Sequence, residues 1–262
     1  MITAGLDVGA LTVKAVVLNN KEILGYENIP ATAYAVQSSH EVMDKLLGKL
    51  DLLYEDIDYC VSTGYGRQII PFAQANMSEI SCHGKGASFL SPSVRTIIDI
   101  GGQDYKAIRV KEDGSLEAFL MNDKCAAGTG RSLEIAAESL GVEISELGSI
   151  SLEAKEPVRL VFVCSSLMAI EVRQMVLEGK NIADIAGGIN DLTARRVASI
   201  VRRLPPKKEI VMTGGVAKNV GVIRSLEREL GARLVQLPED PQIVGALGAA
   251  VIAKEKADAG NS

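Results

Sequence analysis

The sequence contains no tryptophan and only two histidines in 262 residues. Two histidines are too few for a metal site built on several imidazole ligands. No run approaches the roughly 20 apolar residues of a membrane-spanning helix. An acid, Asp7, stands where a secretory signal would continue its apolar core. We therefore expect a cytoplasmic protein that uses no membrane partner.

An excess of basic residues is also absent. The formal net charge is -5, and the Lys and Arg residues are scattered along the chain. Nothing in this pattern favours a nucleic-acid partner. Hydrophobic residues make up 47% and charged residues 23%, which is typical of a globular protein. The length is sufficient for two core-forming lobes.

Cysteine is scarce, with four residues at positions 60, 82, 125 and 164. In a cytoplasmic protein of this size they are poor disulfide candidates, and such cysteines are more often buried, metal-bound or reactive. Cys60 lies inside an apolar strand pattern and is expected in the core. Cys82 precedes His83, but no second pair of this kind exists, so helix packing is the preferred interpretation for it.

Apolar runs alternate with helical periods, which indicates an α/β fold. Ile2 to Leu18 predicts two strands around an Asp7-Val8-Gly9 turn. Helices are expected over residues 38–50, 78–90, 129–140, 166–178, 183–204 and 245–254, strands over 57–63 and 209–212, and a frayed tail over 257–262.

The opening pattern occurs a second time. Residues 96–102 resemble residues 3–9, each segment is followed by another apolar run, and a lysine stands seven residues after each aspartate, as Lys14 and Lys106. A repeat of this kind indicates two related lobes. We expect lobe I to span 1–94 and 240–262, and lobe II to span 95–239.

Four glycine-bearing turns suit a bound nucleotide. Two place an aspartate at the end of a strand, Asp7-Val8-Gly9 and Asp99-Ile100-Gly101-Gly102, and their glycines allow backbone N–H groups close to phosphate oxygens. Aspartates there are suited to Mg²⁺, which keeps several waters. Gly128-Thr129-Gly130 precedes a helix, so phosphate could meet a helix N-terminus, and Thr213-Gly214-Gly215 follows a strand.

Taken in order, these turns resemble the phosphate, phosphate and adenosine motifs of the superfamily that holds actin, heat-shock chaperone ATPases and sugar kinases, with Gly245-Ala246-Leu247-Gly248 as its closing helix. The segments 62–67, 98–104 and 121–131 closely resemble one branch of that superfamily. That branch is the activator ATPases of 2-hydroxyacyl-CoA dehydratases with the related benzoyl-CoA reductase subunits. The resemblance runs from Thr3 to Lys254. It implies an actin-like, ribonuclease H-like fold with ATP or ADP between two duplicated lobes.

The resemblance also implies roles for individual residues. Asp7 and Asp99 would organise Mg²⁺, Gln103 would position the attacking water, and Asp104 would support the phosphate region. The residues expected to bind nucleotide are Asp7, Gly9, Thr12, Lys14, Gly101, Gly102, Gln103, Gly128, Thr129, Gly130, Gly214, Gly215, Ala217 and Asn219. One departure is Ala10-Leu11, where activators usually carry hydroxyl residues.

Two of the cysteines precede expected helices. Cys125 comes shortly before the 129–140 helix and Cys164 directly before the 166–178 helix, positions that favour the thiolate. A [4Fe–4S] cluster usually takes four thiolates, so two per chain would be completed by a twofold homodimer. The resemblance implies this arrangement, with Cys125 and Cys164 as the ligands.

The function implied is an ATP-dependent, low-potential electron donor. Its acceptor would be an iron–sulfur enzyme such as a 2-hydroxyacyl-CoA dehydratase, a benzoyl-CoA reductase or a double-cubane cluster protein, and ferredoxin or flavodoxin would supply the electrons. Two alternatives stay open. A small-molecule kinase would use the same lobes but needs a catalytic carboxylate and a substrate pocket in inserted segments. A nucleotide-gated binding module would need neither cysteine.

Overall fold

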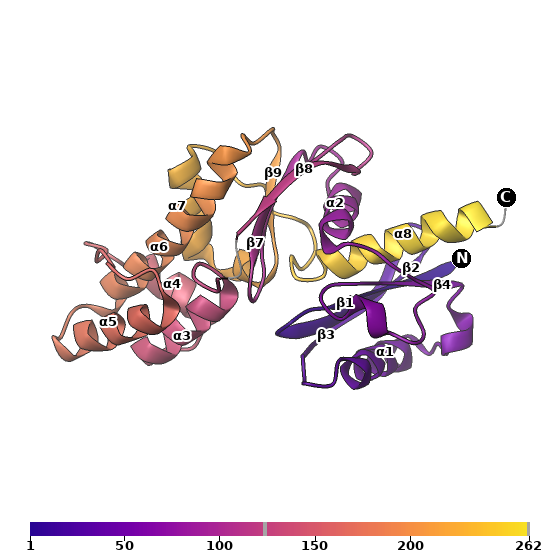
Figure 1. Ribbon diagram of the computed structural model, residues 1–262, viewed down its shortest axis with the longest axis horizontal. Helices are drawn as coiled ribbons and strands as arrows, with labels where there is room; N and C mark the ends of the chain where they lie inside the picture. Colours follow the sequence, from indigo (N-terminus) through magenta and orange to yellow (C-terminus); the bar gives the residue numbers. More distant parts are fainter. Residues whose placement is uncertain (123–124, 261–262) are drawn as a thin grey trace. The chain divides into compact units, whose positions relative to one another are not determined.

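The computed structural model describes residues 1–122 and 125–260 (Figure 1). Two compact units make up the chain. Unit 1 contains residues 1–97, 108–117 and the segment from Leu237 onward, and unit 2 contains residues 98–107 and 118–236. Each unit contains strands, helices and an apolar core of its own, so the described chain is α/β throughout.

Unit 1 is built on a five-stranded sheet in the order β3-β2-β1-β4-β5. The strands are β1 (Ile2–Val8), β2 (Thr12–Asn19), β3 (Glu22–Pro30), β4 (Tyr59–Thr63) and β5 (Ala75–Asn76). The predicted hairpin is confirmed, because β1 pairs antiparallel with β2 and Asp7 stands opposite Lys14. β4 runs parallel to β1, which brings the ends of both strands to one edge of the sheet.

Three helices cover this sheet: α1 (Ala35–Leu50), α2 (Glu79–Leu90) and α8 (Val244–Gly260). α8 packs against β1 and α2, and glycines permit the close approach. A Cβ at Gly5 would lie 2.0 Å from the carbonyl oxygen of Ala246, and one at Gly86 would lie 2.1 Å from that of Val244. The expected frayed tail is wrong for residues 257–260, which continue α8, since Ala253 and its neighbours anchor the helix in the core.

A second sheet has the order β8-β7-β6-β9. Its strands are β6 (Thr96–Ile100), β7 (Tyr105–Val110), β8 (Leu116–Met121) and β9 (Ile210–Thr213). β6 and β7 are the predicted second copy of the opening hairpin, and β6 is buried along its whole length. β8 follows as an edge strand whose side chains alternate between half-buried and exposed.

The helices of unit 2 are α3 (Gly130–Leu140), α4 (Leu147–Ser151), α5 (Ser165–Leu177), α6 (Ile182–Arg203) and α7 (Val220–Leu230), with a short 3₁₀ turn, η3, at Gly215–Lys218. α6 begins where the Asn181 side chain accepts hydrogen bonds from the backbone N–H groups of Ala183 and Asp184. Its buried face, which includes Ile185 and Ile189, forms the centre of the core. Within the described ranges, no helix has the length and apolarity needed to cross a membrane.

Candidate nucleotide turns and cysteine pair

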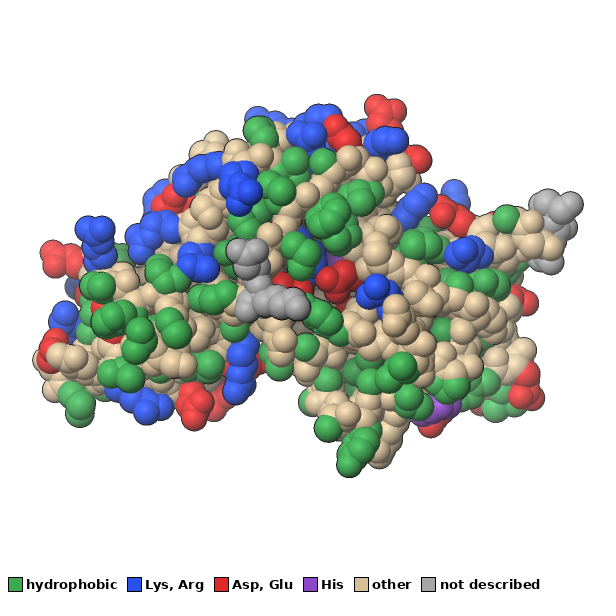
Figure 2. All heavy atoms as spheres, in the orientation of Figure 1, with side chains coloured by type: hydrophobic (Ala, Val, Ile, Leu, Met, Phe, Trp, Pro, Cys, Tyr) green, Lys and Arg blue, Asp and Glu red, His purple; other side chains and the backbone are tan. Residues whose placement is uncertain are grey.

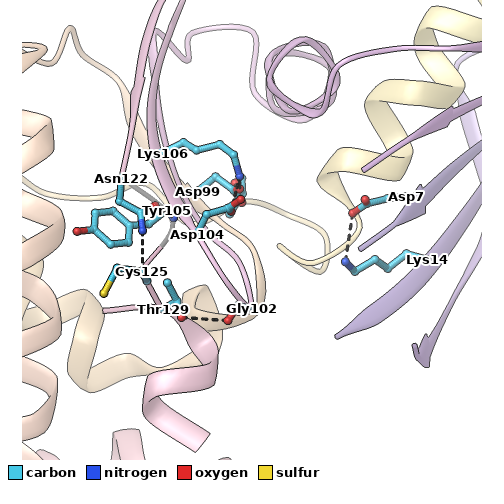
Figure 3. Close-up of polar contacts among 11 residues, drawn as sticks. Asp7, Lys14, Asp99, Gly102, Asp104, Tyr105, Lys106, Asn122, Cys125 and Thr129 are labelled. Carbon is cyan, nitrogen blue, oxygen red and sulfur yellow. Dashed lines mark hydrogen bonds and ion pairs between the residues drawn. The ribbon is translucent and has the colours of Figure 1, made fainter. Parts of the chain in front are cut away.

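The first aspartate turn lies at the end of β1. Lys14, on β2, places its Nζ 3.1 Å from Oδ2 of Asp7, and both side chains are largely buried. The turn itself is closed by the backbone N–H of Gly9, which donates to the carbonyl oxygen of Thr12 at 3.1 Å. The hairpin thus presents a carboxylate and an ammonium group side by side (Figure 3).

Two glycines from other elements surround the Asp7 carboxylate. A Cβ at Gly64, after β4, would lie 2.6 Å from Oδ1 of Asp7, and one at Gly245, at the start of α8, would lie 3.2 Å from Oδ2. Gly64 also has a φ of +84°, which other residues rarely adopt. The start of α8 therefore lies beside the first aspartate turn, where glycine leaves room for the carboxylate.

The second aspartate turn repeats this pairing with a stronger ionic network. Lys106, on β7, places its Nζ 2.5 Å from Oδ1 of Asp104 and 3.4 Å from Oδ2 of Asp99, and all three side chains are buried (Figure 3). Lys106 was not among the predicted site residues. The sequence signal for it was present, because it stands seven residues after Asp99 as Lys14 does after Asp7.

The expected adenosine motif lies against this second turn. The hydroxyl of Thr213, at the end of β9, donates to Oδ1 of Asp99 at 2.9 Å. Gly214 follows with a φ of +83°, and a Cβ there would lie 2.3 Å from the carbonyl oxygen of Ile100. Within unit 2 the structure therefore brings the segments around residues 99 and 214 together, although they are far apart in the sequence.

The start of α3 also lies against the second turn. The N–H of Gly130 donates to the carbonyl of Gly101 at 2.8 Å, and the N–H of Arg131 donates to that of Gly102 at 2.9 Å. The Thr129 side chain is fully buried, and its hydroxyl lies 3.0 Å from the Gly102 carbonyl oxygen (Figure 3). The segment that was expected to meet phosphate is therefore hydrogen-bonded to the second aspartate turn.

The other predicted nucleotide residues have mixed surroundings. Gln103 is exposed at the tip of the second turn, and Gly215 is exposed at the start of η3. Ala217 is half-buried, whereas Asn219 is buried. Oδ1 of the Asn219 side chain accepts from the N–H of Val222 and thereby caps α7, so this side chain already has a structural role.

The four cysteines fall into two classes. Cys60 and Cys82 are buried in unit 1, and burial raises the pKa of each thiol to about 12. Cys125 and Cys164 are exposed and belong to unit 2. The pKa of Cys164, the N-cap residue of α5, is lowered, chiefly because the backbone N–H of Leu167 and then that of Ser166 stabilise the thiolate.

The backbone around Cys125 is held by side chains from neighbouring segments. Nδ2 of Asn122 donates to the Cys125 carbonyl at 2.9 Å, and Nε of Arg196, on α6, donates to the Ala127 carbonyl at 3.0 Å. Gly128, directly after Ala127, adopts a φ of +88°. Two residues of the predicted 121–131 motif, Asp123 and Lys124, lie outside the described residues.

The carboxylates and thiols of the candidate site differ in how they fit the two expected metal groups, Mg²⁺ and a [4Fe–4S] cluster. In the described part of the chain no three His, Cys, Asp or Glu side chains converge on one metal-sized site. Mg²⁺ does not need such a cage when it is held by one or two carboxylates, water and substrate phosphates. Two exposed thiols per chain, one with a lowered pKa, match half the ligand set of a [4Fe–4S] cluster.

Named relatives extend over almost the whole chain. An activator of 2-hydroxyisocaproyl-CoA dehydratase from Clostridioides difficile is 42% identical over 257 residues, covering 98% of this chain and 96% of the relative. An activator of lactoyl-CoA dehydratase from Anaerotignum propionicum is 40% identical over 257 residues, covering 98% and 99%.

Solved structures agree with these relatives. The activator of 2-hydroxyisocaproyl-CoA dehydratase from Clostridium difficile, crystallised with bound ADPNP, superposes with a TM-score of 0.95 at 43% identity and covers 100% of this chain and 97% of its own. A ROK family glucokinase from Streptomyces griseus shares 12% identity at a TM-score of 0.59, covering 97% and 100%, which shows a shared fold alone.

These likenesses confirm the predicted α/β fold of the actin-like ATPase and sugar kinase type. The family model described as "BadF/BadG/BcrA/BcrD ATPase family" matches residues 4–253, the range over which the aspartate turns, the glycine turns and both exposed cysteines occur. The chain therefore belongs to the BadF/BadG/BcrA/BcrD ATPase family.

Proposed function

We propose that this protein is an ATP-hydrolysing activator that delivers single electrons at low potential to a partner iron–sulfur enzyme. The observation that carries the proposal is the division of the cysteines, since the two in unit 2 are exposed and the two in unit 1 are buried. Neither a kinase nor a simple nucleotide switch requires two exposed thiols, one of them with a lowered pKa.

Nucleotide binding is assigned to the two aspartate turns. Asp7 and Asp99 would hold Mg²⁺ through water, with Lys14 and Lys106 as the ion-pair partners of their carboxylates. The backbone N–H groups after each aspartate would bind phosphate oxygens, and the Gly214-Gly215 turn would lie along the nucleoside. The related activator structure from Clostridium difficile, which holds bound ADPNP, supports nucleotide binding by this family.

Hydrolysis is assigned to the tip of the second turn. Gln103 is exposed there, and its neutral amide would orient a water molecule toward the terminal phosphate without acting as a strong base. Asp104 is buried and ion-paired with Lys106, so it would hold the shape of the turn rather than contact water directly. This division of roles suits a slow hydrolysis that is controlled by conformation.

Cys125 and Cys164 would hold a [4Fe–4S] cluster together with the same two residues of a second copy of the chain. Such a cluster accepts and donates one electron at a time when bound. Hydrophobic side chains around Cys164 are exposed: Val161, Phe162, Val163, Leu167 and Ile170. Figure 2 shows hydrophobic side chains at the surface where Figure 1 places α5, which is the kind of surface that a second copy or an acceptor protein covers.

The partners follow from the relatives and from the chemistry. The relatives are named as activators of 2-hydroxyisocaproyl-CoA and lactoyl-CoA dehydratases, so a 2-hydroxyacyl-CoA dehydratase is the acceptor we propose first. A benzoyl-CoA reductase or a double-cubane cluster protein would serve the same one-electron role. Ferredoxin or flavodoxin would be the source of the electron.

The proposal is tested by anaerobic purification, with iron and sulfide analysis and the mass of the assembly. We expect about four irons and four sulfides per dimer, which is the content of one [4Fe–4S] cluster. Cys125→Ser and Cys164→Ser should each lose the iron. Cys60→Ala and Cys82→Ala are the matched controls and should keep it, because both of these thiols are buried.

Other results would favour the alternatives. A colourless, iron-free monomer that hydrolyses ATP would contradict the electron-donor function and leave a small-molecule kinase or a nucleotide-gated binding module. Transfer of phosphate to an added sugar would identify the kinase. Unchanged iron content in all four cysteine variants would show that the iron is bound by residues other than Cys125 and Cys164.

A further inference from the structure

The Thr129 hydroxyl lies between the second aspartate turn and the segment that carries Cys125. It is 3.0 Å from the carbonyl oxygen of Gly102 and 2.5 Å from that of Ala126, and the residue has no exposed surface. A hydroxyl has a single hydrogen, so it can donate fully to only one of these carbonyls at a time. Its burial also removes the side chain from direct contact with a ligand.

Both carbonyls have another donor. The N–H of Arg131 donates to the Gly102 carbonyl, and the N–H of Thr129 itself donates to the Ala126 carbonyl at 3.0 Å. Each carbonyl oxygen therefore keeps one hydrogen bond when the hydroxyl donates to the other carbonyl. The hydroxyl can exchange acceptors at little cost, which is what a two-state contact requires.

From this geometry we propose that Thr129 is a positioning residue that transmits the state of the Gly101–Gln103 turn to the Cys125 segment. The inference rests on the proposed function, because it takes the turn as the place where phosphate binds. Movement of the Gly102 carbonyl toward or away from Thr129 shifts the hydroxyl between its two acceptors. The Ala126 carbonyl, one residue from Cys125, then gains or loses a hydrogen bond.

A second connection runs in parallel through Asn122. Its Oδ1 accepts from the N–H of Tyr105 at 2.8 Å, directly after the turn, and its Nδ2 donates to the Cys125 carbonyl (Figure 3). Tyr105 follows Asp104, whose carboxylate pairs with Lys106. The Cys125 segment is therefore joined to the turn at Gly102 and, just after the turn, at Tyr105, and the Thr129 connection is the one with two alternative acceptors.

The test uses the full chain purified free of iron, so that the thiols are open to reagent. Alkylation of Cys125 by iodoacetamide is followed by peptide mass spectrometry with saturating Mg²⁺-ADP and, separately, with saturating Mg²⁺ and a non-hydrolysable ATP analogue. Thr129→Val keeps the branched shape and removes the hydroxyl, and Thr129→Ser keeps the hydroxyl. Nucleotide binding is measured calorimetrically on the same samples, and the folding of each variant is checked by circular dichroism.

The wild-type chain and Thr129→Ser should show Cys125 rates that differ about fivefold between the two nucleotides, as expected for one hydrogen bond. In Thr129→Val the difference should fall below about twofold. A wild-type difference that persists in Thr129→Val would overturn the inference, as would equal Cys125 rates in a wild-type chain that binds both nucleotides. Failure of the wild-type chain to bind nucleotide would overturn the proposed function and this inference with it.

Should Thr129→Val not fold, Asn122→Ser provides the second measurement, because it shortens the side chain that joins Tyr105 to Cys125. Under the inference the Thr129 connection remains, so this variant should keep a nucleotide-dependent difference in the Cys125 rate while both absolute rates rise. Loss of the whole difference in Asn122→Ser would assign the transmission to Asn122 and overturn the role of Thr129.

Discussion

Lys106 reaches Asp104 at 2.5 Å within the buried interior of unit 2, and its ammonium group also lies 3.4 Å from Asp99. Asp7 and Lys14 repeat the pairing at 3.1 Å on the β1–β2 hairpin of unit 1. Each aspartate that we assign to Mg²⁺ therefore has a lysine from the neighbouring strand as its counter-ion. The repeat visible in the sequence therefore places a lysine beside each of these largely buried carboxylates.

Replacing Lys106 with Met should leave two buried carboxylates without their cation. We expect a loss of about 3–5 kcal/mol in the free energy of unfolding, the usual cost of removing one partner of a buried ion pair. Urea denaturation measures this loss. Lys14→Met is the matched control and should cost less, because the side chains of Lys14 and Asp7 are 13% and 11% exposed and water can reach them.

A loss in Lys106→Met no larger than that in Lys14→Met would contradict this role. It would mean that the carboxylates of Asp99 and Asp104 are compensated by other groups.

Replacing Gly214 with Ala should disturb the turn beside Asp99. Gly214 has a φ of +83°, and the added Cβ would lie 2.3 Å from the Ile100 carbonyl oxygen. Gly231→Ala is the control, because Gly231 also has a positive φ but nothing within 4 Å of a Cβ. We expect a loss of about 1 kcal/mol for the control, from backbone strain alone, and a clearly larger loss for Gly214→Ala.

The nucleotide affinity separates the two variants further. Gly231 is the C-cap residue of α7 and belongs to none of the predicted nucleotide turns. Gly231→Ala should therefore bind Mg²⁺-ADP as the wild type does. Equal stability and equal ADP affinity in the two variants would show that the Gly214 turn is not the nucleoside surface.

The lowered pKa of Cys164 predicts the pH dependence of its chemistry. In the folded chain the backbone N–H groups of Leu167 and Ser166 stabilise the thiolate. The stabilisation of the fold is therefore fully present above the ordinary thiol pKa, 9.0, and is lost as the pH falls through the lowered value. Alkylation of Cys164, followed against pH, should reach half its maximum rate at a lower pH than in the urea-unfolded chain.

Cys60 and Cys82 give the contrast within the same experiment. Burial raises both pKa values to about 12, so neither thiol should react measurably with iodoacetamide between pH 7 and about 9 while the chain is folded. A Cys164 midpoint equal to that of the unfolded chain would contradict the N-cap geometry.

Much of the fold could be predicted from the sequence because its signals are local. The aspartate hairpins, most of the helices and the burial of Cys60 and Cys82 follow from apolar periods and turn residues. β3 and β8 were missed, since both are edge strands with partly exposed faces and therefore weak apolar patterns. α7 was missed although Asn219 and Gly231 mark its two ends.

The candidate site was predictable in its residues more than in their contacts. Glycine and aspartate turns can be recognised from the sequence, but the position of the Thr129 hydroxyl beside the carbonyl oxygens of Gly102 and Ala126 cannot. The role of Lys106 follows from its ion pairs with Asp99, on the neighbouring strand, and with Asp104, in the turn. Contacts between segments distant in sequence, such as Thr213 with Asp99, carry no local signal.

The central claim is that ATP drives the delivery of an electron. The most direct test mixes the dithionite-reduced protein anaerobically with a 2-hydroxyacyl-CoA dehydratase, and in parallel with a benzoyl-CoA reductase and a double-cubane cluster protein. Reduction of the acceptor is followed by EPR with Mg²⁺-ATP, with Mg²⁺-ADP and without nucleotide. We predict that the wild-type protein reduces one acceptor class, and only when Mg²⁺-ATP is present. Cys125→Ser and Cys164→Ser should reduce no acceptor. Reduction that is the same with and without Mg²⁺-ATP, or absent with all three acceptors while ATP is hydrolysed, would contradict the account.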